Sequence, residues 1–213
     1  MKKILLLLFL FLSINKISAQ WDLSASMGLD FKSSPSFRDY VNTGFSYGND
    51  LIPTFKSAIN FTGEAAYKLS NTFALGLEYG LQIDSYTASA GPGGIYEISY
   101  TMQKPSIVAY YVIPGNGYQL KLGGGAGPRL ASLTEKIYNS ADYSVNGYGF
   151  LLKAEGNTIL SRYFYALIGA NIRYDVTGDV SNGQNTLINR ATGEVLNLNA
   201  ISFGIYLGIS FIL

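Results

Sequence analysis

The last thirteen residues of this 213-residue chain alternate between two kinds of side chain. The even positions are mostly small or polar, as in Ser202, Gly204 and Ser210. Because successive side chains of a β-strand point to opposite faces, this period of two predicts a strand with one apolar face. That face consists of Ile201, Phe203, Ile205, Leu207, Ile209, Phe211 and Leu213.

Residues 73–83 repeat the pattern, with Phe73, Leu75 and Leu77 beginning an apolar face and Ala74 and Gly76 beginning the other. An extended strand of this length, tilted about 40°, rises about 28 Å, close to the ~25 Å apolar band of an outer-membrane barrel. Strands of globular proteins are usually nearer 5–6 residues. The length therefore favours a strand that crosses a bilayer.

Six further segments fit the same template more loosely, at 21–32, 58–69, 96–113, 118–133, 145–157 and 163–177. In the segment 96–113, Pro105 predicts a bulge or an edge irregularity, because proline donates no ladder hydrogen bond. Lys104 then faces outward, which requires a phase shift or a position above the membrane. The outward face is expected to contain Tyr96, Ile98, Tyr100, Val108, Tyr110 and Val112.

The connections between these eight segments alternate in length. Three are short, at 70–71, 114–117 and 158–162, and four are longer, at 33–57, 87–95, 134–144 and 178–196. Short turns on one side and long loops on the other are typical of outer-membrane barrels. The predicted fold is all-β: an eight-stranded antiparallel up-and-down transmembrane β-barrel with meander topology. Its short turns and both ends lie in the periplasm and its longer loops are extracellular.

Residues 1–19 have the pattern of a secretory signal peptide. Lys2 and Lys3 precede an apolar run from Ile4 to Leu12, and Ser18 and Ala19 match a cleavage site. The run is shorter than the ~20 residues of a spanning helix. We therefore expect a cleaved leader, a barrel domain over 20–213, and a location in the cell outer membrane.

Fourteen charged residues fall on the predicted inner faces. A charged Arg or Lys on the lipid face near the midplane costs roughly 2–4 kcal/mol, whereas charges inside a barrel can pair. Since eight strands leave an interior just wide enough for side chains, a structural plug is favoured over an ion or proton path. The fourteen are Asp22, Asp30, Lys32, Glu64, Lys68, Glu78, Asp84, Glu97, Lys121, Arg129, Lys153, Glu155, Arg173 and Asp175. Eight of them form the predicted interior polar network: Glu64, Glu78, Lys121, Arg129, Lys153, Glu155, Arg173 and Asp175.

Two of these acids should be neighbours. Glu64 and Glu78 lie at similar distances from the turn at 70–71, so they should stand side by side on the inner face of a hairpin. Two close carboxylates in a low-dielectric interior need a proton or a cation. We expect Lys153 or Lys121, or an arginine from a second layer, to reach across the barrel and close the lumen, with Arg129 and Arg173 nearer the long loops.

Aromatic residues cluster near the expected strand ends, as in the interfacial girdles of outer-membrane barrels. The predicted girdle residues are Trp21, Tyr67, Tyr79, Tyr96, Tyr110, Tyr118 and Tyr163.

The stretches 103–111 and 118–128 resemble the outer-membrane barrel domains of Bacteroidetes-type bacteria, the small "porin family" barrels of OmpX-like or PorT-like type. The shared features are a strand with an internal proline, a short turn, and a strand that ends in Gly125-Ala126-Gly127-Pro128. Residues 211–213 are similar to a barrel-assembly signal, which implies contact with the barrel-assembly machinery. The resemblance implies a fold and a location; it supplies no catalytic residues.

The chain has no His and no Cys. The absence of histidine disfavours an enzyme, because histidine is the usual general base near neutral pH. No catalytic, cofactor-binding or metal site is therefore predicted. The favoured function is a non-enzymatic structural or interaction role, through the extracellular loops or within a membrane assembly. A narrow channel or transporter for small solutes, a membrane-embedded hydrolase without histidine, and a secreted lipocalin-like barrel are the alternatives.

The expected surroundings are outer-membrane lipid and lipopolysaccharide, with loops 33–57 and 178–196 as the candidate contacts for a protein partner. Without Lys2, Lys3 and Lys16 the chain has 12 basic and 14 acidic residues. That balance predicts no nucleic-acid partner, which would require a basic patch.

Overall fold

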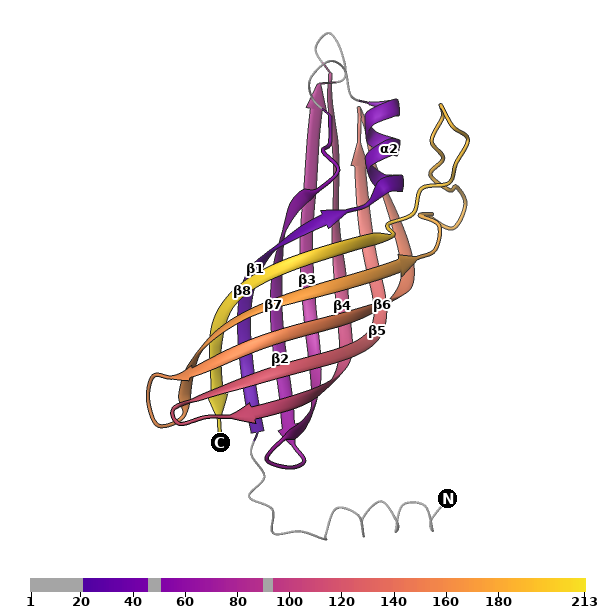
Figure 1. Ribbon diagram of the computed structural model, residues 1–213. Coiled ribbons are helices and arrows are strands. Elements are labelled where there is room, and N and C mark those ends of the chain that lie inside the picture. Colours follow the sequence, from indigo (N-terminus) through magenta and orange to yellow (C-terminus); the bar gives the residue numbers. More distant parts are fainter. Residues whose placement is uncertain (1–20, 46–50, 90–93) are drawn as a thin grey trace, which may run out of the picture.

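The computed structural model describes residues 21–45, 51–89 and 94–213, so the predicted leader lies outside the described residues. Eight antiparallel strands close into one barrel in sequential order, and β1 pairs with β8 (Figure 1). This confirms the predicted fold class and strand count. The strands are β1 Trp21–Ser33, β2 Lys56–Lys68, β3 Phe73–Ser89, β4 Ile95–Pro114, β5 Tyr118–Lys136, β6 Ser140–Ile159, β7 Phe164–Thr177 and β8 Ala200–Ile212.

The two ends of the barrel differ, as Figure 1 shows. The β2–β3, β4–β5 and β6–β7 connections and the C-terminus lie at one end, here called the turn end. At the other, the loop end, β3, β4, β5 and β6 extend well beyond the rest of the barrel. Much of what was expected as loop at 87–95 and 134–144 is therefore strand, because β3 continues to Ser89 and the β5–β6 connection shrinks to 137–139.

The connection 33–57 contains a helix, α2 (Pro35–Gly44), which sequence analysis did not predict. Pro35 occupies the first turn, where its missing N–H costs nothing. Phe37, Tyr40 and Val41 are buried on one face at helical spacing. Among the described residues, no helix is long and apolar enough to cross a membrane.

The odd positions of β8 face outward, as predicted, and so do those of β1 and β3. The outer surface of the barrel toward the turn end is consequently a belt of exposed apolar side chains, here called the apolar belt. It includes Leu77, Leu152, Ile168, Ile205 and Leu207.

The predicted orientation of β4 was wrong. The expected outward set is buried inside the barrel: Tyr96, Ile98, Tyr100, Val108, Tyr110 and Val112. Glu97 instead points outward, whereas Lys104 is only 1% exposed and lies inside. Pairing of β3 with β4 is continuous from Phe73–Tyr111 to Ser89–Ile95, so no bulge shifts the phase.

The reason is that the inward face of β4 is largely apolar along its whole length, whereas its outward face changes character halfway along. Toward the turn end its outward residues are apolar, as in Ile107 and Ile113, but toward the loop end they are polar, as in Glu97 and Thr101. The inward face shows no matching change: Val108 and Val112 are buried toward the turn end and Ile98 and Met102 toward the loop end, with Lys104 between them. The outward face of the strand thus runs from an apolar to a polar environment.

Candidate functional site

The centre of the lumen contains an ion-pair network. Glu64 on β2 and Glu78 on β3 are directly opposed in the register. The Nζ of Lys153 on β6 lies 2.8 Å from Glu64 Oε2 and 2.7 Å from Glu78 Oε2. The predicted pairing of the two acids and its bridging by Lys153 are therefore present. Lys153 also lies 2.8 Å from Glu155 Oε1, so one ammonium serves three carboxylates.

Lys121 extends the network toward the turn end. Its Nζ lies 2.8 Å from Glu155 Oε2, 3.1 Å from Asp22 Oδ2 and 3.7 Å from Glu64 Oε1. These side chains are buried, and isolated charges there would be strongly disfavoured. The shared contacts make the network one connected unit.

Toward the loop end, arginines join the network as predicted. Arg173 Nη2 lies 2.8 Å from Glu78 Oε1, which connects the arginine layer to the central pair. Asp175 is bound from two sides, by Arg129 Nε at 2.5 Å and by Lys104 Nζ at 2.8 Å. All eight predicted network residues are therefore buried and ion-paired, whereas Glu97 faces outward and Lys68 is half-buried.

Two tyrosines take part in the network. Tyr110 was predicted at the lipid interface, but it is buried and donates a hydrogen bond to Glu64. Tyr206 donates to Glu155 Oε1 at 3.0 Å. The Tyr206 ring lies over Gly169, where an added Cβ would come within 2.3 Å of it. Glycines in the wall thus leave the space that the rings fill.

The wall itself has a seam between β4 and β5. Pairing stops after Gln103–Leu130 and resumes at Ile107–Ala126, and the unpaired stretch places Pro105 opposite Pro128. Neither proline has an N–H to donate. Arg129 lies inside the seam and donates through Nη1 to three oxygens: Gly127 O at 3.2 Å, Pro128 O at 3.0 Å and Ser106 Oγ at 3.3 Å.

Above the ion network the lumen is filled by an apolar cluster, here called the mouth cluster. Its α2 members, Phe37, Tyr40 and Val41, pack inside the upper barrel against residues such as Tyr100, with the Phe37 and Tyr100 rings 5.6 Å apart. Further members are Ile52, Ala88, Tyr96, Ile98, Met102, Ala131, Leu133, Val145, Val180, Leu187, Leu196 and Leu198. Sequence analysis missed this cluster, although Pro35 and the spacing of Phe37, Tyr40 and Val41 are a helix signal.

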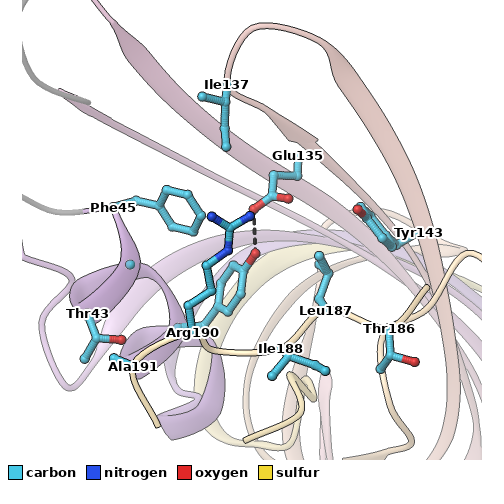
Figure 2. Close-up of a pocket in the computed structure, with 12 residues that line it drawn as sticks. Thr43, Phe45, Glu135, Ile137, Tyr143, Thr186, Leu187, Ile188, Arg190 and Ala191 are labelled. Carbon is cyan, nitrogen blue, oxygen red and sulfur yellow. Dashed lines mark hydrogen bonds between the residues drawn. The ribbon is translucent and has the colours of Figure 1, made fainter. Parts of the chain in front are cut away.

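A cavity of about 570 Å³ opens beside the mouth cluster and is here called the mouth pocket (Figure 2). Three separate segments line it. The end of α2 contributes Tyr40 and Phe45, and the β5–β6 hairpin contributes Glu135 and Tyr143. The loop before β8 supplies residues 186–188, Arg190 and Ala191.

Glu135 is the buried charge of the mouth pocket, with 9% of its surface exposed. Its Oε1 accepts hydrogen bonds from Tyr40 at 2.7 Å and from Tyr96 at 2.9 Å. Burial, together with the Glu135 carboxylate, holds the pKa of both tyrosines well above the ordinary value of 10.0. The two hydroxyls therefore remain donors to the Glu135 side chain beside the cavity.

Within the described ranges, no group of three or more His, Cys, Asp or Glu side chains is placed to hold a metal ion. No family model matches the sequence, and no curated protein matches it.

Solved structures of outer-membrane proteins share the fold at low identity. Neisserial surface protein A is 11% identical with a TM-score of 0.52, over 90% of this chain and 96% of that chain. Ail, the attachment invasion locus protein of Yersinia pestis, in complex with the heparin analogue sucrose octasulfate, is 14% identical with a TM-score of 0.53, over 92% and 100%. A major outer membrane protein from Thermus thermophilus is 12% identical with a TM-score of 0.54, over 92% and 100%. The chain thus has the fold of small outer-membrane β-barrels.

Proposed function

We propose that this chain is a non-enzymatic outer-membrane protein of the Bacteroidetes-type porin family, whose closed barrel carries a folded binding surface outside the cell. The observation that carries the proposal is the change in the outward face of β4. Outward residues that are apolar from Ile107 to Ile113 and polar from Glu97 to Gln103 match a wall that leaves lipid and enters water. The apolar belt is the proposed contact with lipid and lipopolysaccharide.

The filled lumen supports an interaction role over transport. The ion network occupies the lower lumen and the mouth cluster occupies the upper lumen. Open aqueous channels are found in barrels of about 16–18 strands. The elaborate part of the molecule is instead the loop end, where α2 and the loop 178–199 form a compact surface. This surface is the proposed contact for a partner, and residues 211–213 are the proposed contact for the assembly machinery.

The orientation can be tested by cysteine labelling, because the natural chain has no cysteine. Tyr138, 88% exposed at the tip of the β5–β6 hairpin, and Ser70, in the β2–β3 turn, mark the two ends. In intact cells, a membrane-impermeant maleimide should label the Tyr138→Cys variant. The Ser70→Cys variant should react only after the outer membrane is permeabilised. Labelling of Ser70→Cys alone in intact cells would reverse the orientation, and equal labelling of both would contradict an outer-membrane location.

Planar-bilayer recording separates this proposal from the channel alternative. The wild-type barrel should show no stable ionic conductance, because the lumen is closed at two levels. A steady, ion-selective conductance from the unmodified protein would favour the channel.

A further inference from the structure

The mouth pocket holds two opposite charges that are not paired with each other. Glu135 uses Oε1 to accept the two tyrosine hydroxyls. Arg190 lines the same cavity from the loop before β8, is exposed, and makes no ion pair with any residue in the described ranges. Figure 2 shows both side chains in the cavity, with the guanidinium on the same side as the carboxylate.

The rest of the cavity wall combines apolar side chains with the hydroxyl-bearing Thr43, Tyr143 and Thr186. Phe45 stacks on Tyr96 with ring centroids 3.9 Å apart and the planes within 2° of parallel, which holds this wall in place. Ile137, Leu187 and Ile188 line the cavity further. The volume of about 570 Å³ lies within the ~300–1,000 Å³ of small-molecule sites, which also combine apolar walls with a few placed polar groups.

These features restrict the ligand. A simple cation would pair with Glu135 but would leave Arg190 facing a like charge. A simple anion would pair with Arg190 but would be repelled by Glu135. A molecule with both charges satisfies both residues, and an apolar side chain uses the remaining wall.

We propose that the mouth pocket binds a small zwitterion with an apolar side chain, such as a free hydrophobic amino acid or a dipeptide. Its ammonium contacts Glu135 and its carboxylate contacts Arg190, the latter with the two-pronged geometry that guanidinium groups offer to carboxylates. This inference rests on the proposed function, because it requires the mouth pocket to face the outside of the cell.

Calorimetric titration of the full-length barrel in detergent micelles tests the ligand class. The probes are L-leucine and glycyl-L-leucine, compared with N-acetyl-L-leucine, which lacks the cation, and L-leucinamide, which lacks the anion. At least one zwitterion should bind about tenfold or more tightly than both single-charge analogues, because each analogue loses a charge-assisted hydrogen bond. Absence of binding by both zwitterions, or equal binding of all four probes, overturns the proposal.

Two variants assign the charges. Glu135→Gln retains an oxygen that can accept from Tyr40 and Tyr96, so the wall is preserved while the charge is lost. It should remove the preference for a free amine, and Arg190→Gln should remove the preference for a free carboxylate. The matched controls are Glu194→Gln, in the same loop, and Arg38→Gln, on α2; neither residue lines the cavity.

If Arg190 instead closes onto Glu135 as an ion pair, both variants bind the zwitterions as well as the wild type, and the proposal fails. The cysteine-labelling result is independent of this outcome. Failure of ligand binding is therefore distinguishable from failure of the proposed location.

Discussion

At the scale of single residues, Lys153 connects the buried acids at the centre of the lumen. Its ammonium lies within 2.8 Å of oxygens from Glu64, Glu78 and Glu155. These three acids belong to β2, β3 and β6. Buried charges are tolerated only when they are paired, so the stability of the interior depends on this one cation more than on any exposed lysine.

Replacing Lys153 with Met should therefore destabilise the barrel by about 3–5 kcal/mol, the usual loss when one partner of a buried pair is removed. The measurement is denaturant unfolding of the protein in lipid vesicles, followed by fluorescence of Trp21, the single tryptophan. Lys136→Met, at the exposed end of β5, is the control and should unfold like the wild type. A similar midpoint for Lys153→Met would show that the acids do not depend on it.

Gly149 makes a second residue-scale prediction. A Cβ there would lie 2.2 Å from Arg129 Nε and 2.3 Å from Asp175 Oδ1, within the ion pair that joins these two residues. Gly149→Ala should destabilise the barrel by about 1–3 kcal/mol through overpacking. At Gly63 an added Cβ would meet nothing within 4 Å, so Gly63→Ala is the matched control in the same unfolding assay. Equal midpoints for the two variants would contradict the packing argument.

At the scale of elements, the instructive case is β4. A continuous strand was predicted correctly, but its orientation was inverted, because the apolar residues Tyr96, Ile98 and Tyr100 were interpreted as lipid-facing. They are apolar because they contact α2 and its neighbours. Lys104 was the signal that could have corrected this: a lysine on a predicted lipid face conflicts with the assigned phase, and inverting the phase buries it beside Asp175.

The same exchange of environment predicts a difference along β3. Leu77 is 66% exposed in the apolar belt, and Thr87 is exposed on the same face near the loop end. Leu77→Arg should impair folding into vesicles by roughly 2–4 kcal/mol, the cost of a cation at mid-membrane. Thr87→Arg should fold like the wild type, because that part of the strand lies in water. If both variants inserted equally well, the belt would not be embedded in lipid.

Docking of α2 should weaken at strongly alkaline pH. Burial, and then the hydrogen bond to Glu135, raises the pKa of Tyr40 above its ordinary 10.0. A pKa that is higher in the docked form contributes stability that is complete below pH 10 and is lost as the pH rises through the raised value. The difference between the ultraviolet phenolate titrations of wild type and Tyr40→Phe should give a midpoint above 10.0.

The Glu135→Gln background should lower that midpoint, since it removes the carboxylate that opposes ionisation. A Tyr40 midpoint at 10.0 in the wild type would mean that the hydroxyl is solvated and that α2 does not seal the upper lumen.

At the scale of the whole molecule, the barrel contains two interiors of opposite character. The one toward the turn end contains the ion network beside a small apolar cluster around Val108 and Val112, and the one toward the loop end is apolar; each fills the space inside one closed wall. The fold and the pairing of Glu64 with Glu78 could be predicted, because a period of two and the distance from a turn fix local register. The mouth pocket could not, because Tyr40, Glu135 and Arg190 come from three segments that only the folded loops bring together.

The seam between β4 and β5 makes the resistance of the barrel wall to pulling uneven. Elsewhere a tensile load across neighbouring strands is shared among many ladder bonds, but between Gln103 and Ile107 the β5 side offers no ladder pairs to share it. The guanidinium of Arg129 donates to Gly127 O and Pro128 O on its own strand, and its hydrogen bond to Ser106 Oγ at 3.3 Å reaches across to β4. A load that pulls β4 and β5 apart therefore meets fewer hydrogen bonds here than in the paired stretches of the same two strands, and this line lies at the level where the two interiors meet.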